Sequence, residues 1–186
     1  MKCTVWLCMI VLLFSGCASN NKPLEQGMEF RSRLLSAQGC QFSAVITADY
    51  GDEVYTFSTD CRADSTGEIA FCVSQPETLS GISGTVSDTG GTLTFEDTAL
   101  CFPLLADDQL SPVSAPWIFL KTLRSGCLTS ACMEEEWLRL CVDDSYQEDA
   151  LRLDIWMNEE RMPVRSDILY DGKRILSLEI ENFVFL

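Results

Sequence analysis

The sequence predicts an α+β domain built on an antiparallel sheet of about nine strands. Apolar and polar residues alternate in nine separate stretches, and short turns rich in Gly and Asp join many of them. Helical spacing of apolar residues occurs instead before the first strand and between two groups of strands. We therefore expect a helix, five strands, a second helix and four strands, in that order.

The first helix is predicted over residues 23–38. Pro23 suits the first helical turn, where the missing N–H is not needed, and Gly39 stands where a helix stop is expected. The apolar residues at helical spacing are Leu24, Met28 and Leu35, with Phe30 and Leu34 widening the stripe. We expect this stripe to pack on the domain; the alternative is a membrane-surface helix, which Glu25 and Glu29 disfavour.

Five strands follow the helix with a period of two. Phe42, Ala44 and Ile46 alternate with more polar residues, and residues 88–91, Asp-Thr-Gly-Gly, are a strong hairpin signal. The strands are expected at residues 40–48, 53–62, 68–74, 82–87 and 92–100. Closely spaced strands joined by short turns predict an antiparallel meander.

A short second helix is predicted over residues 117–124, ending near Gly126, after a loop at residues 104–110. Its large apolar side chains are too numerous for a solvated surface: Trp117, Ile118, Phe119, Leu120 and Leu123. We expect it to be buried against the sheet, with ordinary core packing as the simpler role. The last four strands are expected at residues 136–143, 150–158, 164–170 and 175–186.

The N-terminus has the pattern of a secretory signal peptide. Lys2 precedes an apolar run at residues 5–14, too short to span a bilayer, and small residues follow. The position of Cys17 after Ser15 and Gly16 resembles the lipobox of bacterial lipoproteins, although Phe14 stands where Leu is usual. The alternatives are an ordinary secretory signal and a retained anchor helix.

The lipobox resemblance implies that the peptide is cut before Cys17 and that the Cys17 thiol carries acyl chains. Residues 1–16 would then be a lipoprotein signal peptide, residues 17–22 a tether and residues 23–186 a single domain. Such a protein is exported and anchored by its lipid to the cell membrane, facing the extracytoplasmic side.

Composition narrows the classes of function. Without residues 1–16 the chain has 12 Lys and Arg against 28 Asp and Glu, a net charge of −16. This excess argues against binding nucleic acid and against lying flat on an anionic leaflet. The sequence has no His, which removes the usual general base and the commonest transition-metal ligand. We expect a non-enzyme without cofactor or metal; the alternative is a hydrolase using the acidic run at residues 134–136.

Seven cysteines lie beyond Cys17, so at least one is expected to stay unpaired or to pair outside the chain. Their spacing does not match a zinc site. A turn centred on Thr66-Gly67 would place Cys61 directly opposite Cys72, which predicts a cross-strand disulfide between them. Cys40, on the preceding strand, is the competing partner for Cys61.

The C-terminal segment carries a family resemblance. Residues 153–157 (Leu-Asp-Ile-Trp-Met), 162–164 (Met-Pro-Val), 168–172 (Ile-Leu-Tyr-Asp-Gly) and 178–183 (Leu-Glu-Ile-Glu-Asn-Phe) resemble the final sheet of the lipoprotein-localisation, LolA/LolB-like proteins. The resemblance implies a half-barrel, a strongly curved and incompletely closed sheet, with the second helix covering its concave face. That family has no catalytic residues to transfer.

The resemblance implies binding of a lipid, an acyl chain or another hydrophobic ligand in an apolar cavity. The candidate lining residues are Phe42, Ile46, Phe57, Phe71, Phe95, Trp117, Phe119, Leu120, Leu123, Leu153, Ile155, Leu178 and Ile180. Each is equally suited to an ordinary core. The alternative is a non-catalytic protein-interaction or sensor domain on the same scaffold, with a filled core.

Overall fold

A computed structural model of the 186-residue chain describes residues 21–106, 109–147 and 150–186. Cys17 and the predicted signal peptide lie outside these residues. The first part contains α2 (Lys22–Ser36), β1 (Gly39–Asp49), β2 (Val54–Asp64), β3 (Ile69–Gln75), β4 (Ser83–Ser87), β5 (Gly90–Phe95) and β6 (Thr98–Phe102). The second contains the short β7 (Leu105–Ala106) and β8 (Gln109–Leu110), then α3 (Ala115–Ser125), β9 (Cys127–Glu134), β10 (Trp137–Asp143), β11 (Arg152–Met157), β12 (Pro163–Tyr170) and β13 (Lys173–Phe185).

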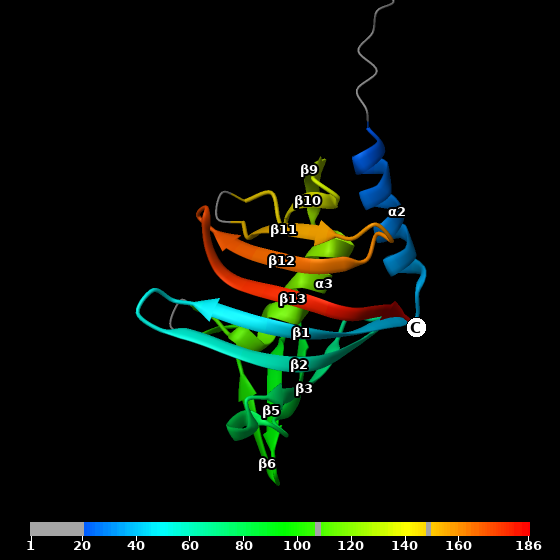
Figure 1. Cartoon of the computed structure of the whole chain (residues 1–186). Helices are drawn as coiled ribbons and strands as arrows, with labels where there is room; N and C mark the ends of the chain where they lie inside the picture. The colour runs from blue at the N-terminus through cyan, green and yellow to red at the C-terminus, as the bar shows by residue number, and fades with distance from the viewer. Residues whose placement is uncertain (1–20, 107–108, 148–149) are drawn as a thin grey trace, which may run out of the picture.

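Eleven strands form one curved antiparallel sheet (Figure 1). Their order is β6-β5-β4-β3-β2-β1-β13-β12-β11-β10-β9, so the first and last strands of the chain pair at the centre. In that pair Ile46 lies opposite Leu178, and Ala44 opposite Ile180. The sheet does not close, because β6 and β9 are its two edges. The predicted α+β class and curved sheet are confirmed, with eleven strands in place of about nine.

Three strand predictions were wrong. Residues 92–100 form no single strand, because the chain turns at Glu96, whose φ is 51°, and separates β5 from β6. Strand β9 was not predicted, since Thr129 and Ser130 interrupt its apolar alternation; it is held by pairing with β10. The predicted loop at residues 104–110 contains the small β7–β8 pair.

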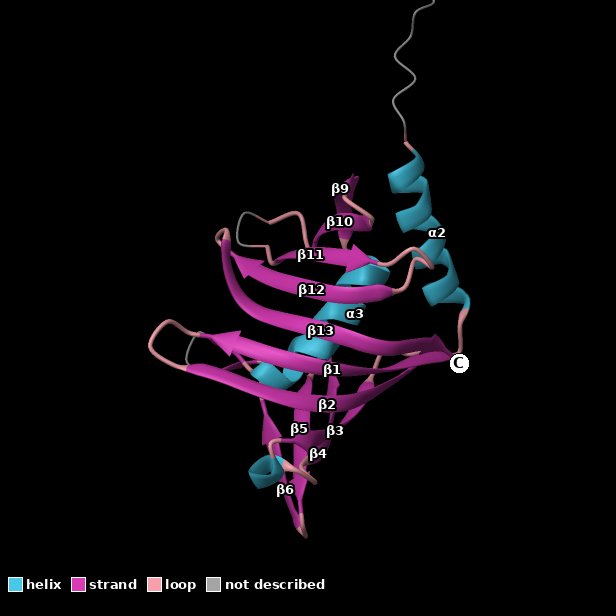
Figure 2. Cartoon of the chain, viewed as in Figure 1, coloured by secondary structure: helices cyan, strands magenta, loops and turns pink. Residues whose placement is uncertain are grey.

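Helix α3 lies across one face of the curved sheet, which is its concave face (Figure 2). Residues from both halves of the sheet and from α3 share one apolar cluster. Within it, Phe42 stacks on Phe183 at 5.6 Å between ring centroids and meets Phe119 edge-on at 5.9 Å. The expected burial of the second helix against the sheet is confirmed.

Helix α2 packs beside β9 and β10, where Gly27 lies against Leu128 and Leu140, and its Phe30 ring contacts Phe183 and Phe185 of β13. Its buried residues are Gly27, Phe30 and Leu34. The predicted packing stripe was therefore partly wrong: Leu24, Met28 and Leu35 are exposed. Within the described residues, neither helix has both the length and the apolar character needed to cross a membrane.

Candidate functional site

The concave face of the sheet is lined by apolar side chains. Alternation along each strand directs every second residue inward, as the burial pattern of β1 shows. Twelve of the thirteen candidate lining residues are at most 7% exposed and belong to the central cluster. They are Phe42, Ile46, Phe57, Phe71, Trp117, Phe119, Leu120, Leu123, Leu153, Ile155, Leu178 and Ile180.

Phe95 was wrongly placed among them. It is 48% exposed, near the end of β5 and next to the turn that leads into β6. The prediction failed because residues 92–100 were treated as one strand. In the hairpin, Phe95 pairs with Thr98 at the turn, away from the central cluster.

Helix α3 fills the space above the concave face. Phe119 is completely buried, and Ile118, Leu120 and Leu123 are at most 4% exposed. Two long side chains fasten the C-terminal end of the helix. Arg31 of α2 donates to the carbonyl oxygen of Leu123, and Arg124 donates to that of Ser65, both at 2.7 Å. In this arrangement apolar side chains occupy the interior.

Two hydroxyl groups in this interior lack hydrogen-bond partners. Ser166 on β12 is fully buried, and in the sheet it lies between Ile155 and Leu178, two of the lining residues. Thr122 of α3 is 1% exposed. Neither Ser166 Oγ nor Thr122 Oγ1 has a partner, and an unpaired buried hydroxyl costs about 1–3 kcal/mol. Both hydroxyls are therefore unused polar groups among buried apolar side chains.

A surface hollow of about 490 Å³ opens beside α3. It is lined by Trp117, Lys121 and Arg124 of α3 and by the turns that carry Glu68 and Asp88. The Lys121 ammonium lies 5.1 Å from the centre of the Trp117 ring. The hollow is therefore lined by both basic and acidic side chains. It lies where the helix meets the sheet, at one edge of the apolar interior.

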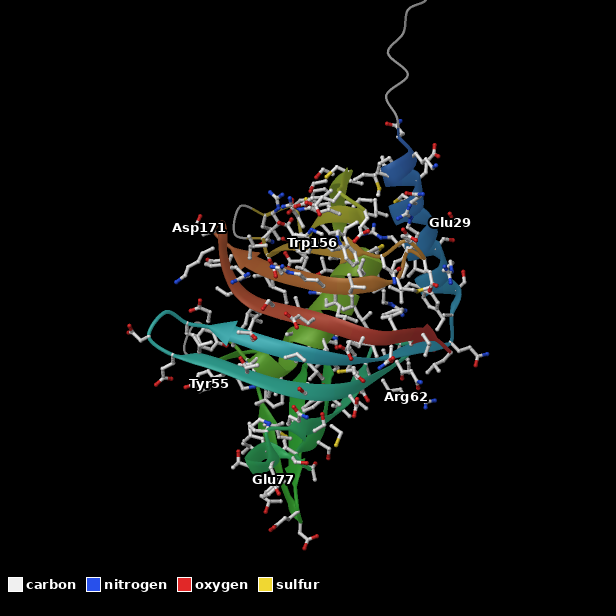
Figure 3. All side chains as sticks on the ribbon, viewed as in Figure 1. Glu29, Tyr55, Arg62, Glu77, Trp156 and Asp171 are labelled. Carbon is white, nitrogen blue, oxygen red and sulfur yellow. The ribbon has the colours of Figure 1, made fainter. Side chains whose placement is uncertain are left out.

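On the outer face of the sheet, charged side chains form a network around the Trp156 ring (Figure 3). The Trp156 ring is flanked by the guanidinium groups of Arg139 at 5.3 Å and Arg165 at 4.8 Å. Arg139 also binds Asp154 at 2.7 Å, and Arg165 binds Asp167 at 2.8 Å. These contacts link β10, β11 and β12 on the outer face, so the network stabilises the curved sheet.

The predicted disulfide between Cys61 and Cys72 is wrong. In the register of β2 and β3, Cys61 lies opposite Phe71 and Cys72 opposite Asp60, so the two thiols point to opposite faces. The seven cysteines of the described residues are all free thiols. Burial raises the pKa of Cys40 and that of Cys61 to about 12. In the part of the chain that the structure describes, no three potential metal ligands gather.

No family model matches this sequence, and no curated protein matches it either. Solved structures similar to the chain include a putative outer membrane lipoprotein-sorting protein domain from Vibrio parahaemolyticus, with 8% identity, a TM-score of 0.45 and coverage of 89% of this chain and 92% of that one. A LolA superfamily protein from Nitrosomonas europaea has 6% identity, a TM-score of 0.42 and coverage of 85% and 91%. The lipoprotein LppX from Mycobacterium tuberculosis has 9% identity, a TM-score of 0.43 and coverage of 90% and 96%.

Structures of the kind that the C-terminal resemblance implied are thus among those similar to this chain. At these identities and TM-scores they say nothing about which ligand or partner it binds. The proposed chemistry therefore rests on the residues of this chain.

Sequence reasoning missed four polar residues of the interior and its rim: Thr122, Ser166, Lys121 and Arg124. A signal existed for Lys121, which follows Trp117 by one helical turn. A signal also existed for Ser166, because it occupies an inward position in the alternation of β12.

Proposed function

We propose that this chain is an exported, membrane-anchored protein of the cell envelope that binds a lipid, an acyl chain or another hydrophobic ligand between α3 and the concave face. The observation that carries this proposal is an apolar concave face covered by a single short helix. An acyl chain inserted between α3 and this face would make the same kind of apolar contacts. Residues 1–16 would be removed and Cys17 would carry the anchor.

Ligand entry requires α3 to move away from the sheet. The helix meets the sheet mainly through apolar side chains, and the hydrogen bonds from Arg31 and Arg124 fasten one end. The unpaired hydroxyls of Ser166 and Thr122 would gain partners from an ester or head group. The proposed activity is binding without catalysis; the carboxylates at residues 134–136 lie at the β9–β10 turn, on an edge of the sheet.

Native mass spectrometry of protein extracted mildly from membranes tests this proposal. We expect a co-purified lipid, with its binding lost in Phe119→Glu, which places a charge at the buried centre of α3. The matched control is Phe95→Glu, a change at an exposed phenylalanine that should leave the lipid bound. Wild-type protein that carries no lipid and takes up no added fatty acid or hydrophobic dye would contradict the proposal.

The second candidate function is a protein-interaction domain with a permanently filled core. The near-complete burial of Phe119, Leu120 and Leu123 favours it. So does the edge strand β6, where Leu100 is 61% exposed and the strand has an unpaired side. In that case Leu100→Lys would weaken the capture of a protein partner, and no lipid would be found in the wild-type protein.

A further inference from the structure

One side of α2 exposes a row of large apolar side chains. Leu24, Met28 and Leu35 are 40%, 49% and 53% exposed. Their spacings of four and seven residues place them on one line along the helix. The side that packs on the domain carries other residues: Gly27, Phe30 and Leu34. The packing of α2 on the domain therefore buries one apolar side of the helix and leaves a second apolar side exposed to solvent.

The orientation of α2 on the domain is fixed by close contacts. A Cβ atom on Gly27 would lie 2.8 Å from a methyl group of Leu140, so the helix backbone sits directly on β10. Arg31 adds its hydrogen bond to the carbonyl oxygen of Leu123. Because these contacts set the rotation of the helix, the exposed row stays on one solvent-facing side of α2, next to the side that packs on the domain.

The exposed row lies close, along the chain, to the predicted lipid anchor. Four residue steps separate Cys17 from Asn21, a span of at most about 14 Å in a fully extended chain. Leu24 is in the first turn of α2. Residues 21–38 contain three basic and two acidic side chains, so this segment has none of the strong negative charge of the mature chain.

We propose that Leu24, Met28 and Leu35 lie on the lipid surface in which Cys17 is anchored, so that α2 docks the domain in one fixed orientation. This inference rests on the proposed lipidation of Cys17. Large apolar side chains next to an anchor gain by entering the interface, and the second contact adds to the binding that acyl chains provide. The acidic remainder of the domain would face away from the bilayer.

Photo-crosslinking of the full-length, lipidated protein in phosphatidylcholine vesicles tests the docking. A benzophenone side chain is introduced at position 28 or 35, and at positions 29 and 170 as controls. Glu29 is on another side of α2, and Tyr170, 49% exposed like Met28, adjoins Asp171 at the far end of the sheet (Figure 3). Lipid adducts should form at positions 28 and 35 severalfold more than at 29 and 170. Met28→Glu should lower the adducts from position 35, and Tyr170→Glu should not.

Lipid adducts spread equally over positions 28, 29 and 170 would overturn the docking, and so would adducts from position 28 to a protein. The intact mass of the same sample shows whether Cys17 is acylated, and so it separates a failure of docking from a failure of anchoring. An acylated Cys17 without adducts at position 28 overturns the docking alone. An unmodified Cys17 overturns the proposed anchoring and, with it, this inference.

Discussion

Asp154 shows how one nearly buried carboxylate is kept charged. Burial by itself raises the pKa of Asp154, but hydrogen bonds from Arg139 and the Cys141 thiol and the charges of Arg139 and Arg152 lower it below its ordinary value. We expect Asp154→Asn to reduce the free energy of unfolding by about 1–3 kcal/mol at neutral pH, because Arg139 loses a charged partner. Urea unfolding measures this change.

The same carboxylate predicts a pH dependence. Its native pKa lies below the unfolded value of about 3.9, so its stabilisation is complete above that value and disappears as the pH falls through the native pKa. The wild type should therefore lose more stability than Asp154→Asn on acidification below pH about 4. The control is Asp171→Asn, at an exposed turn with φ of 48°, which Asn tolerates. Equal acid sensitivity of wild type and Asp154→Asn would contradict the prediction.

The thiols are expected to differ in reactivity. Cys72, Cys101 and Cys132 are exposed, whereas Cys40 and Cys61 are buried with pKa values raised to about 12 by that burial. Iodoacetamide at about pH 8 should label the three exposed thiols of the native protein and reach the two buried ones only after unfolding. Peptide mapping gives the result, and rapid labelling of Cys61 or a peptide joining it to Cys72 would refute the assignment.

The failed disulfide has a physical cause that the sequence already contained. The β2–β3 connection is a three-residue loop, Ser65-Thr66-Gly67, in place of the two-residue turn assumed. Asp64 accepts hydrogen bonds from the backbone N–H groups of Thr66 and Gly67, and Gly67 has a φ of 93°. A shift of one residue moves a side chain to the other face of the sheet, and so it separates the two thiols.

At the scale of the element, α3 should contribute much of the stability of the domain. Phe119 is fully buried and contacts Phe42, so Phe119→Ala should lower the free energy of unfolding by about 3–5 kcal/mol. The matched change Phe95→Ala, at a half-exposed position, should stay within about 0.5 kcal/mol. Chemical denaturation of both variants checks the pair, and equal losses would show that the burial of α3 has been misassigned.

The packing of α2 on β10 depends on Gly27, which has no side chain. Gly27→Leu should destabilise the domain by about 1–3 kcal/mol, because the new side chain collides with Leu140. Leu has a higher helix propensity than Gly, so any loss reports the collision and not the helix itself. Glu29→Leu, on an exposed position of α2, is the control. A thermal midpoint raised in Gly27→Leu would contradict this packing.

Helices and strands with a strong local pattern of apolar residues were predicted, and those with a weak pattern were missed. The apolar crowding at residues 117–123 predicted a buried helix because no amphipathic stripe is that wide. Strand β9 gave no such signal, since an edge strand that exposes Ser130 and Cys132 needs no apolar alternation. The turn at Glu96 was missed because its residues lack the usual Gly or Asn for a positive φ.

At the scale of the whole molecule, the antiparallel meanders before and after α3 were predictable, and the pairing that joins them into one sheet was not. Pairing of β1 with β13 joins segments more than 120 residues apart, and no local sequence pattern records such a contact. The curvature and the covering helix came from the resemblance of the C-terminal segment. The sequence did not predict whether α3 fills the concave face or covers it loosely. That depends on side-chain packing, which the alternation of apolar and polar residues does not determine.

The most direct test of ligand binding between α3 and the sheet is photo-crosslinking with a fatty acid that carries a photoreactive group at its chain end. The full-length protein is irradiated with this probe, and the modified peptides are identified by mass spectrometry. The adducts should lie in α3 and on inward residues of the sheet such as Ser166 and Leu178, and excess unlabelled fatty acid should abolish them. Saturable adducts confined to the outer face, around Trp156 and Arg165, or no saturable adducts at all, would contradict a ligand site under α3.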